Sequence, residues 1–188
     1  MVVEPRFRRT IISGLNYIAG ESGIDSATES LQIVDYEHHE IHSGSHYFIA
    51  GSQAFSNGQV VDFTVITPNT TKWLHMTFNI EGTSGVSIEV KEAATVNVAG
   101  TPVTVINNDR NSTNTTGATI RTGDTFTSEG TSLFKQQTGA NQKAGSLERN
   151  REIILKQNTT YIFRLKNETA VANQITYAAN WYEHTNKN

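Results

Sequence analysis

Apolar and polar residues alternate along several short stretches of the chain, and this alternation is the clearest structural signal in the sequence. In KWLHMTFNI (72–80) the large apolar side chains are two residues apart: Leu74, Met76, Phe78 and Ile80. Because successive side chains of a β-strand point to opposite faces of a sheet, this spacing predicts a half-buried strand. VSIEVKE (86–92) and YIFRLKN (161–167) show the same pattern.

Further strand-like stretches follow one another at short intervals: HYFIAG, VVDFTVIT, ATVNVAG, PVTVIN, ATIRTG, SLFKQQ, EIILK and QITYAANWYEH. Together they predict roughly ten short strands separated by turn-rich sequence. No stretch sustains an apolar period of 3.6 residues over three turns, so long helices are not expected. A chain of 188 residues fits one domain. The pattern predicts an all-β fold, an antiparallel β-sandwich or jelly roll, over residues 36–188.

Three segments lack the pattern of a buried strand. Residues 1–35 mix apolar and polar positions without alternation, and we expect an extended N-terminal arm there that packs on a neighbour. NNDRNSTNTTGAT (107–119) is too polar for a buried strand and predicts a long exposed loop. QTGANQKAGSLERN (137–150) predicts a second one. Long loops of this kind are usually functional or mobile.

Charge and cysteine content exclude several classes of function. The net charge is −3, so a general nucleic-acid or anionic-membrane binder is not expected; the exception is a local cluster of Arg6, Arg8 and Arg9. The chain has no cysteine, which removes disulfides and thiolate chemistry. No apolar run approaches the roughly 20 residues that span a bilayer, and the first 20 residues make a poor secretory signal. A soluble, unprocessed protein is expected.

The segment EHHEIHSGSHYF (37–48) holds four of the six histidines and invites interpretation as a metal site. As a strand it would place His38, Glu40 and His42 on one face; as a helix it would stack His38 over His42. A metal-dependent jelly-roll enzyme using His38, His42 and His46 is therefore one hypothesis. However, the zincin order His-Glu-x-x-His is absent, and the spacing departs from the cupin motifs. We favour a structural or intersubunit hydrogen-bonding cluster, with a pH-sensitive contact as the alternative.

The sequence contains no other coherent active site. It has no Gly-x-Ser-x-Gly elbow, no Walker A stretch and no Gly-x-Gly-x-x-Gly fingerprint. We therefore expect no enzymatic activity, no cofactor and no bound metal. Arg110, in the first polar loop, is suited to act as a forked donor to a carboxylate or carbonyl of a neighbour, or else is a solvated surface arginine.

Four stretches, in this order, resemble capsid decoration or cement proteins of tailed bacteriophages: YEHHEIHSGSHYF (36–48), GTPVTVINNDRNSTNT (100–115), ILKQNTTYIFRLKN (154–167) and WYEH (181–184). The resemblance covers most of the chain from Tyr36 to its end and leaves residues 1–35 unmatched. It implies a β-sandwich on the outer surface of the phage head that binds the major capsid protein and catalyses nothing. It also implies a homotrimer, a turn ending at Gly44, and a subunit contact near the NNDRNS loop.

This interpretation names a set of contact residues. We expect capsid or intersubunit contacts from the arm and the polar loop, through Arg6, Phe7, Arg8, Arg9, Arg110 and Asn111. We also expect a hydrogen-bonded ladder across the symmetry axis, formed by His38, Glu40 and His42. A different hypothesis is a glycan- or receptor-binding module of a phage head or tail fibre, in which exposed aromatic residues stack on sugars: Trp73, Trp181 and Tyr182.

Overall fold

The structure, a computed structural model, describes residues 36–139 and 145–185. The chain divides into two compact units, residues 1–39 and 40–188. Of the first unit only residues 36–39 are described, and they form the start of a short helix, α2 (Tyr36–His42). The second unit is built of antiparallel strands, which confirms the predicted all-β sandwich.

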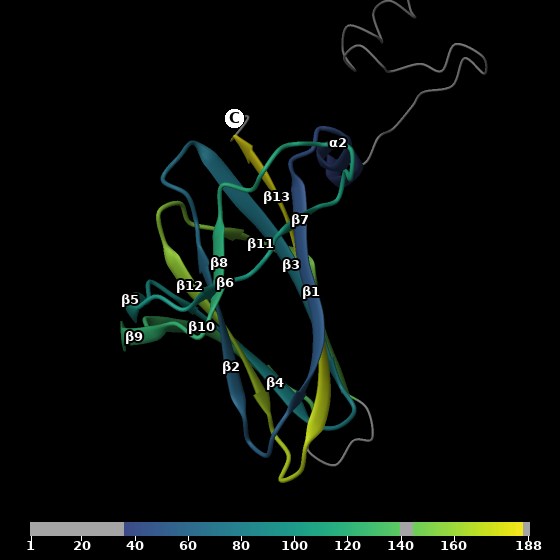
Figure 1. Cartoon of the computed structure of the whole chain (residues 1–188), viewed down its shortest axis with the longest axis vertical. Coiled ribbons are helices and arrows are strands. Elements are labelled where there is room, and N and C mark those ends of the chain that lie inside the picture. Colours follow the sequence, from purple (N-terminus) through teal and green to yellow (C-terminus); the bar gives the residue numbers. More distant parts are fainter. Residues whose placement is uncertain (1–35, 140–144, 186–188) are drawn as a thin grey trace, which may run out of the picture. The chain divides into compact units, whose positions relative to one another are not determined.

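The larger sheets of the second unit face each other (Figure 1). The first has five strands in the order β11 (Gly145–Leu155), β3 (Lys72–Gly82), β13 (Asn173–Thr185), β1 (His46–Phe55) and β7 (Ile106–Asn107). The second has six, in the order β10 (Thr131–Gln137), β4 (Val86–Glu92), β12 (Thr160–Asn167), β2 (Val60–Ile66), β8 (Thr119–Thr122) and β6 (Thr101–Pro102).

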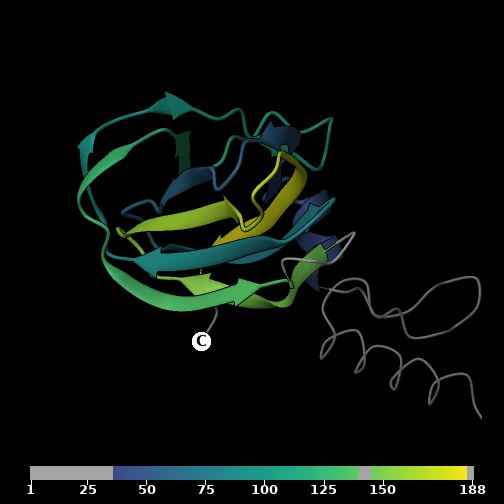
Figure 2. The same ribbon diagram turned by 90° about the horizontal axis from the view of Figure 1, so that it is seen from below.

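A separate two-stranded ribbon, β5 (Thr95–Val98) and β9 (Thr125–Ser128), extends to one side of the sandwich (Figure 1, Figure 2). Most of its side chains are exposed. The end of the ribbon is tied to the second sheet by an ion-pair network on the sheet's outer face. There Arg164 of β12 binds Asp62 through two hydrogen bonds of 2.8 Å and reaches Glu129, which also contacts Lys91.

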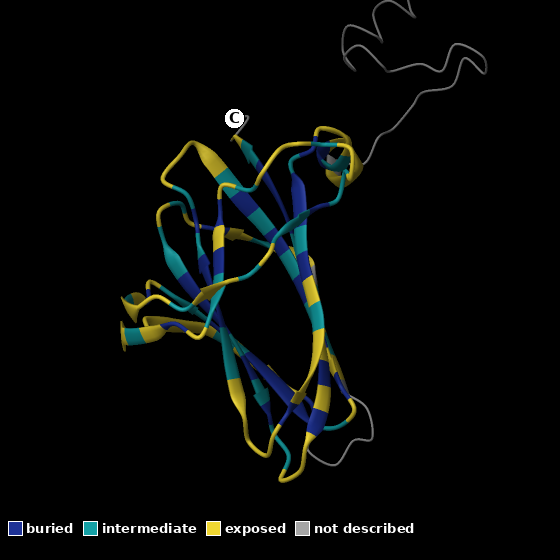
Figure 3. Cartoon of the chain, viewed as in Figure 1, coloured by how far each residue is buried: buried dark blue, intermediate teal, exposed yellow. Residues whose placement is uncertain are grey.

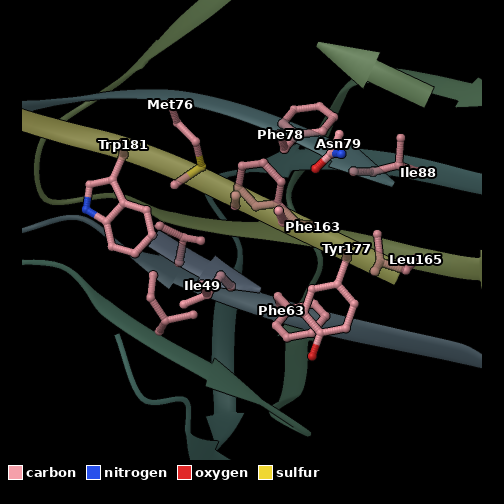
Figure 4. A pocket seen from close by; sticks show the side chains of 14 residues that line it. Ile49, Phe63, Met76, Phe78, Asn79, Ile88, Phe163, Leu165, Tyr177 and Trp181 are labelled. Carbon is pink, nitrogen blue, oxygen red and sulfur yellow. The ribbon is translucent and has the colours of Figure 1, made fainter. Parts of the chain in front are cut away.

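The core lies between the two sheets and follows the predicted alternation. Leu74, Met76, Phe78 and Ile80 of β3 are all buried, and along this strand they alternate with half-buried positions (Figure 3). Phe78 meets Phe163 of the opposite sheet edge to face, with ring centroids 5.7 Å apart (Figure 4). Edge-to-face packing of this kind adds about 0.5–1.5 kcal/mol to the burial of the rings.

Of the two predicted polar loops, the structure agrees with the first and differs in part from the second. Residues 108–118 form a long connection between β7 and β8 without a strand of its own, as expected. The prediction of a loop over residues 137–150 is wrong in part, because β11 begins at Gly145; residues 140–144 lie outside the described part. Among the described strands β11 pairs only with β3 and is an edge strand, so few apolar residues are needed in its first half. There Leu147 is half-buried and packs on the core, and the Arg149 guanidinium lies over the Phe134 ring.

Candidate functional site

The predicted contact residues fall into three places. Arg6, Phe7, Arg8 and Arg9 lie outside the described residues. The histidine segment forms the helix α2, and the helical alternative therefore holds: His38 and His42 are four residues apart and both exposed. Arg110 and Asn111 are exposed in the loop between β7 and β8.

Glu40 does not share the environment of the two exposed histidines. It is 5% exposed, and its carboxylate accepts a hydrogen bond from the Ser45 hydroxyl of the same chain. In a helix, residues two positions apart point to different sides, so the face that a strand would have given to all three residues does not form. This burial removes Glu40 from the predicted intersubunit ladder.

Gly44 ends the helix in the way the sequence requires. The Ser45 N–H donates to the Glu40 carbonyl at 3.0 Å and the Gly44 N–H to the Ile41 carbonyl at 3.0 Å, which is a Schellman motif. Gly44 has a φ of 71°, in the left-handed region that favours glycine. A Cβ at Gly44 would collide with the Ser112 side chain, so the polar loop lies directly against this turn.

The polar loop is fixed by its own asparagine and aspartate side chains. Asn107 donates from Nδ2 to the Gly44 carbonyl at 2.9 Å, and its Oδ1 accepts from the Asp109 N–H at 2.9 Å. Asp109 in turn accepts from the Asn111 N–H at 2.9 Å. Such side-chain bonds to the backbone two residues on replace a regular ladder. Arg110 and Asn111 therefore sit on an ordered exposed tip.

Glu183 holds the other end of the loop. This carboxylate is 3% exposed and accepts from the backbone N–H groups of Gly117 at 2.9 Å and Ala118 at 3.4 Å, and from the Thr116 hydroxyl. The indole N–H of Trp181 also lies 3.3 Å from its Oε1. Glu183 and these donors satisfy one another away from water, so the buried charge is compensated.

Tyr182 and His184, which flank Glu183 on the same strand, face outward. They form a histidine cluster with His75 and Glu152. Nε2 of His184 lies 2.8 Å from Nε2 of His75, and Nδ1 of His75 lies 2.9 Å from Glu152. The Tyr182 hydroxyl donates to Glu152 at 2.8 Å, and the Tyr182 ring stacks on His75 with centroids 4.7 Å apart. The motif WYEH is thus divided: Trp181 and Glu183 face the interior, and Tyr182 and His184 face outward.

Parts of the four stretches that resemble decoration proteins lie at one end of the second unit's sandwich (Figure 1). The turn after β11 contacts the connection between β2 and β3, since the Asn158 N–H donates to the Pro68 carbonyl at 3.1 Å. Pro68 also lies beside Gly117. We call this region the loop end; it comprises residues 43–45, 67–71, 108–118, 156–159 and 181–185.

The contacts of Glu183, His75 and Glu152 were not predicted from the sequence. The alternation within WYEH carries part of the signal, because it places Trp181 and Glu183 on one face of a strand. What each face would touch depends on strand pairing, which the sequence does not encode locally.

Two of the three aromatic residues proposed to stack on sugars are buried, Trp181 in the core and Tyr182 on the outer side of the sheet against Glu152 and His75. Trp181 is 1% exposed and Tyr182 6% exposed, and Figure 4 shows Trp181 among the core side chains Met76 and Phe163. Trp73 is half-buried. Trp181 and Tyr182 are therefore structural, which contradicts their predicted role in glycan stacking.

Within residues 36–139 and 145–185, no group of three or more His, Asp or Glu side chains is arranged to hold a metal ion. None of the helices in that part of the chain is long and apolar enough to cross a membrane.

No protein-family model matches the chain, and no curated protein matches its sequence.

Proposed function

We propose that this chain is a structural protein of a bacteriophage virion that binds the outer surface of the head, contacts the major capsid protein and catalyses no reaction. The observation that carries the proposal is the loop end. Four stretches that are scattered along the sequence and resemble decoration proteins contribute to one continuous region. Residues that share a binding surface are expected to gather in this way.

The loop end is suited to binding a large rigid partner. Its exposed tip, Arg110 and Asn111, is held by the hydrogen bonds of Asn107 and Asp109. An ordered loop loses little conformational entropy on binding, so more of the free energy of each weak contact contributes to affinity. On a symmetric capsid many copies bind at once, and avidity multiplies the effect of each contact.

We further infer that the sandwich is a jelly roll and that the protein is trimeric. The jelly roll is supported by the eight longest strands, which divide into the neighbour orders β11-β3-β13-β1 and β10-β4-β12-β2. Apart from β4 and β10, strands that follow one another in this set lie in opposite sheets, as in two interlocked Greek keys. The trimer is supported by the resemblance, with residues 1–35 and the exposed histidines of α2 as the proposed contacts.

Co-sedimentation with phage heads assembled without this protein tests the proposal. We expect saturable binding of the full chain. The Arg110→Ala variant removes a forked donor from the loop end, and loss of a charged hydrogen bond weakens each contact by about tenfold. Arg151→Ala is the matched control, since Arg151 is an exposed arginine on β11.

Two outcomes would contradict the proposal. A full-length folded protein that does not sediment with the heads would reject the function. Binding that weakens equally in Arg110→Ala and Arg151→Ala would reject the loop end as the binding surface, because the effect would then follow from net charge alone.

A further inference from the structure

Strand β1 has an edge that is largely unpaired. It is joined to β13 along its whole length, but on its other side β7 pairs only with Tyr47 and Phe48 (Figure 1). From Ile49 to Phe55 no other described strand continues this side of the sheet.

The backbone groups that point out of this edge can be identified from two hydrogen bonds. The Ser45 carbonyl accepts from Glu183 of β13, whereas the His46 carbonyl accepts from Asn108 on the β7 side. The direction alternates along an antiparallel strand, and the pairing of β1 with β13 has no register shift. The N–H and C=O groups of Ala50, Ser52 and Ala54 therefore point outward.

The other sheet edges carry features that oppose pairing with another chain. Strand β11 has charged residues, among them Arg149 and Glu152, and a register shift. Strand β10 has a register shift and Lys135, and β6 is two residues long and ends in Pro102. These are the usual protections of exposed edges. The segment AGSQA (50–54) has no charge, no proline and no bulge.

On the inner face of the same segment, the Tyr177 hydroxyl is a second group that an added strand could contact. Gly51 lies under the ring of Tyr177, and a Cβ at this position would collide with the Tyr177 hydroxyl. That hydroxyl makes no hydrogen bond to another described residue, and Figure 4 shows it pointing away from the apolar core side chains. A residue placed opposite Gly51 on an added strand would lie beside it.

We propose that the free edge of β1 pairs with β1 of a second copy of this chain, antiparallel and centred on Ser52. The edge is self-complementary: Ser52 faces Ser52 of the partner subunit, and Ala50 faces Ala54 of the partner subunit. All the outward N–H and C=O groups of the three residues are then paired. Gly51 faces Gln53 of the partner subunit, whose amide reaches the Tyr177 hydroxyl. The side chains at Ala50, Ser52 and Ala54 are small and uncharged, so the two copies approach without repulsion.

This contact is two-fold and forms in solution, so it does not depend on the proposed function. It is compatible with a three-fold contact elsewhere on the chain. On a capsid it would tie neighbouring decoration units together.

Engineered cysteines test the contact and its register, because the chain has no cysteine of its own. Opposite residues of a hydrogen-bonded antiparallel pair are about 5.5 Å apart at Cα, within disulfide range. The full-length Ser52→Cys variant is expected to oxidise to a covalent dimer. Ser146→Cys, an exposed serine on the other edge strand, is the control. Equal dimer yields from the two variants would overturn the proposal.

The register has its own test. A mixture of Ala50→Cys and Ala54→Cys proteins is expected to form a mixed dimer. Neither variant alone is expected to form a disulfide-linked dimer, since residue 50 of one copy would lie about 13 Å along the strand from residue 50 of the other, and the same holds for residue 54. Ala54→Pro removes one outward N–H per copy and should lower the cross-linking of Ser52→Cys at least about fivefold. A thermal unfolding curve checks that this variant is folded. Unchanged cross-linking in a folded Ala54→Pro background would also overturn the pairing.

Discussion

The carboxylate of Glu183 accepts two hydrogen bonds from the backbone N–H of Gly117, at 2.9 Å to Oε2 and 3.1 Å to Oε1. This contact joins the last strand of the sandwich to the end of the polar loop. It anchors this end of the loop, because Glu183 is buried and surrounded by donors.

Replacing Glu183 by Gln should lower the free energy of unfolding by about 2–4 kcal/mol, because the amide brings N–H groups against N–H donors and removes the charge that they stabilise. Denaturant unfolding measures the change. Glu148→Gln, at an exposed position of β11, is the control and should change stability by less than about 0.5 kcal/mol. Similar losses in the two variants would contradict the anchoring role.

Substitutions at Gly44 and Gly58 distinguish the cost of backbone strain from the cost of a steric collision. Both have positive φ, 71° and 61°, but a Cβ meets Ser112 at Gly44 and nothing within 4 Å at Gly58. Gly58→Ala should reduce stability by about 1 kcal/mol through strain alone. Gly44→Ala should reduce it by about 2–4 kcal/mol, because Ser112 must also move. Equal losses in thermal or denaturant unfolding would show that the loop does not pack on this turn.

The ion-pair network of Arg164 predicts a pH dependence. Hydrogen bonds from Arg164 and then Lys91 lower the pKa of Glu129 from 4.5 to about 2. A carboxylate whose folded pKa is depressed stabilises the fold above its unfolded pKa, and this contribution is lost as pH falls from about 4.5 to about 2. Urea unfolding across this range should show a shallower decline for Glu129→Gln.

The size of this effect should be small and sensitive to salt. The Glu129 side chain is 44% exposed, so solvent and ions screen its ion pairs. Added salt should therefore bring the pH profiles of the parent and of Glu129→Gln closer together. Profiles that already coincide at low ionic strength would exclude a stabilising role for this network.

The contact between His75 and His184 should be measurable as an energetic coupling. With the two Nε2 atoms 2.8 Å apart, one ring must donate and the other accept. A double-mutant cycle with His75→Ala and His184→Ala should give a coupling of about 0.5–1.5 kcal/mol in denaturant unfolding. Additive losses would mean that the two rings are neighbours without a hydrogen bond.

The sequence by itself determined the class of fold. Two-residue alternation in residues 72–80 and 161–167 identifies half-buried strands, because a sheet exposes one face of each strand to the core. The polar loop before β8 was also predictable, since its asparagines and serines cannot fill a core. The predicted loop over 137–150 failed at β11, where an edge strand needs few apolar residues and so resembles a loop in sequence.

Tertiary structure decided the remainder. The local sequence of the histidine segment allowed either a strand or a helix. In the structure it is a helix, and its end is fixed by Gly44 and by the polar loop packed against Gly44. Glu183, His75 and Glu152 acquire their roles only when β3, β11 and β13 lie side by side. Local alternation assigns a face to each side chain, but the partner on that face is set by strand order and register, which are properties of the whole chain.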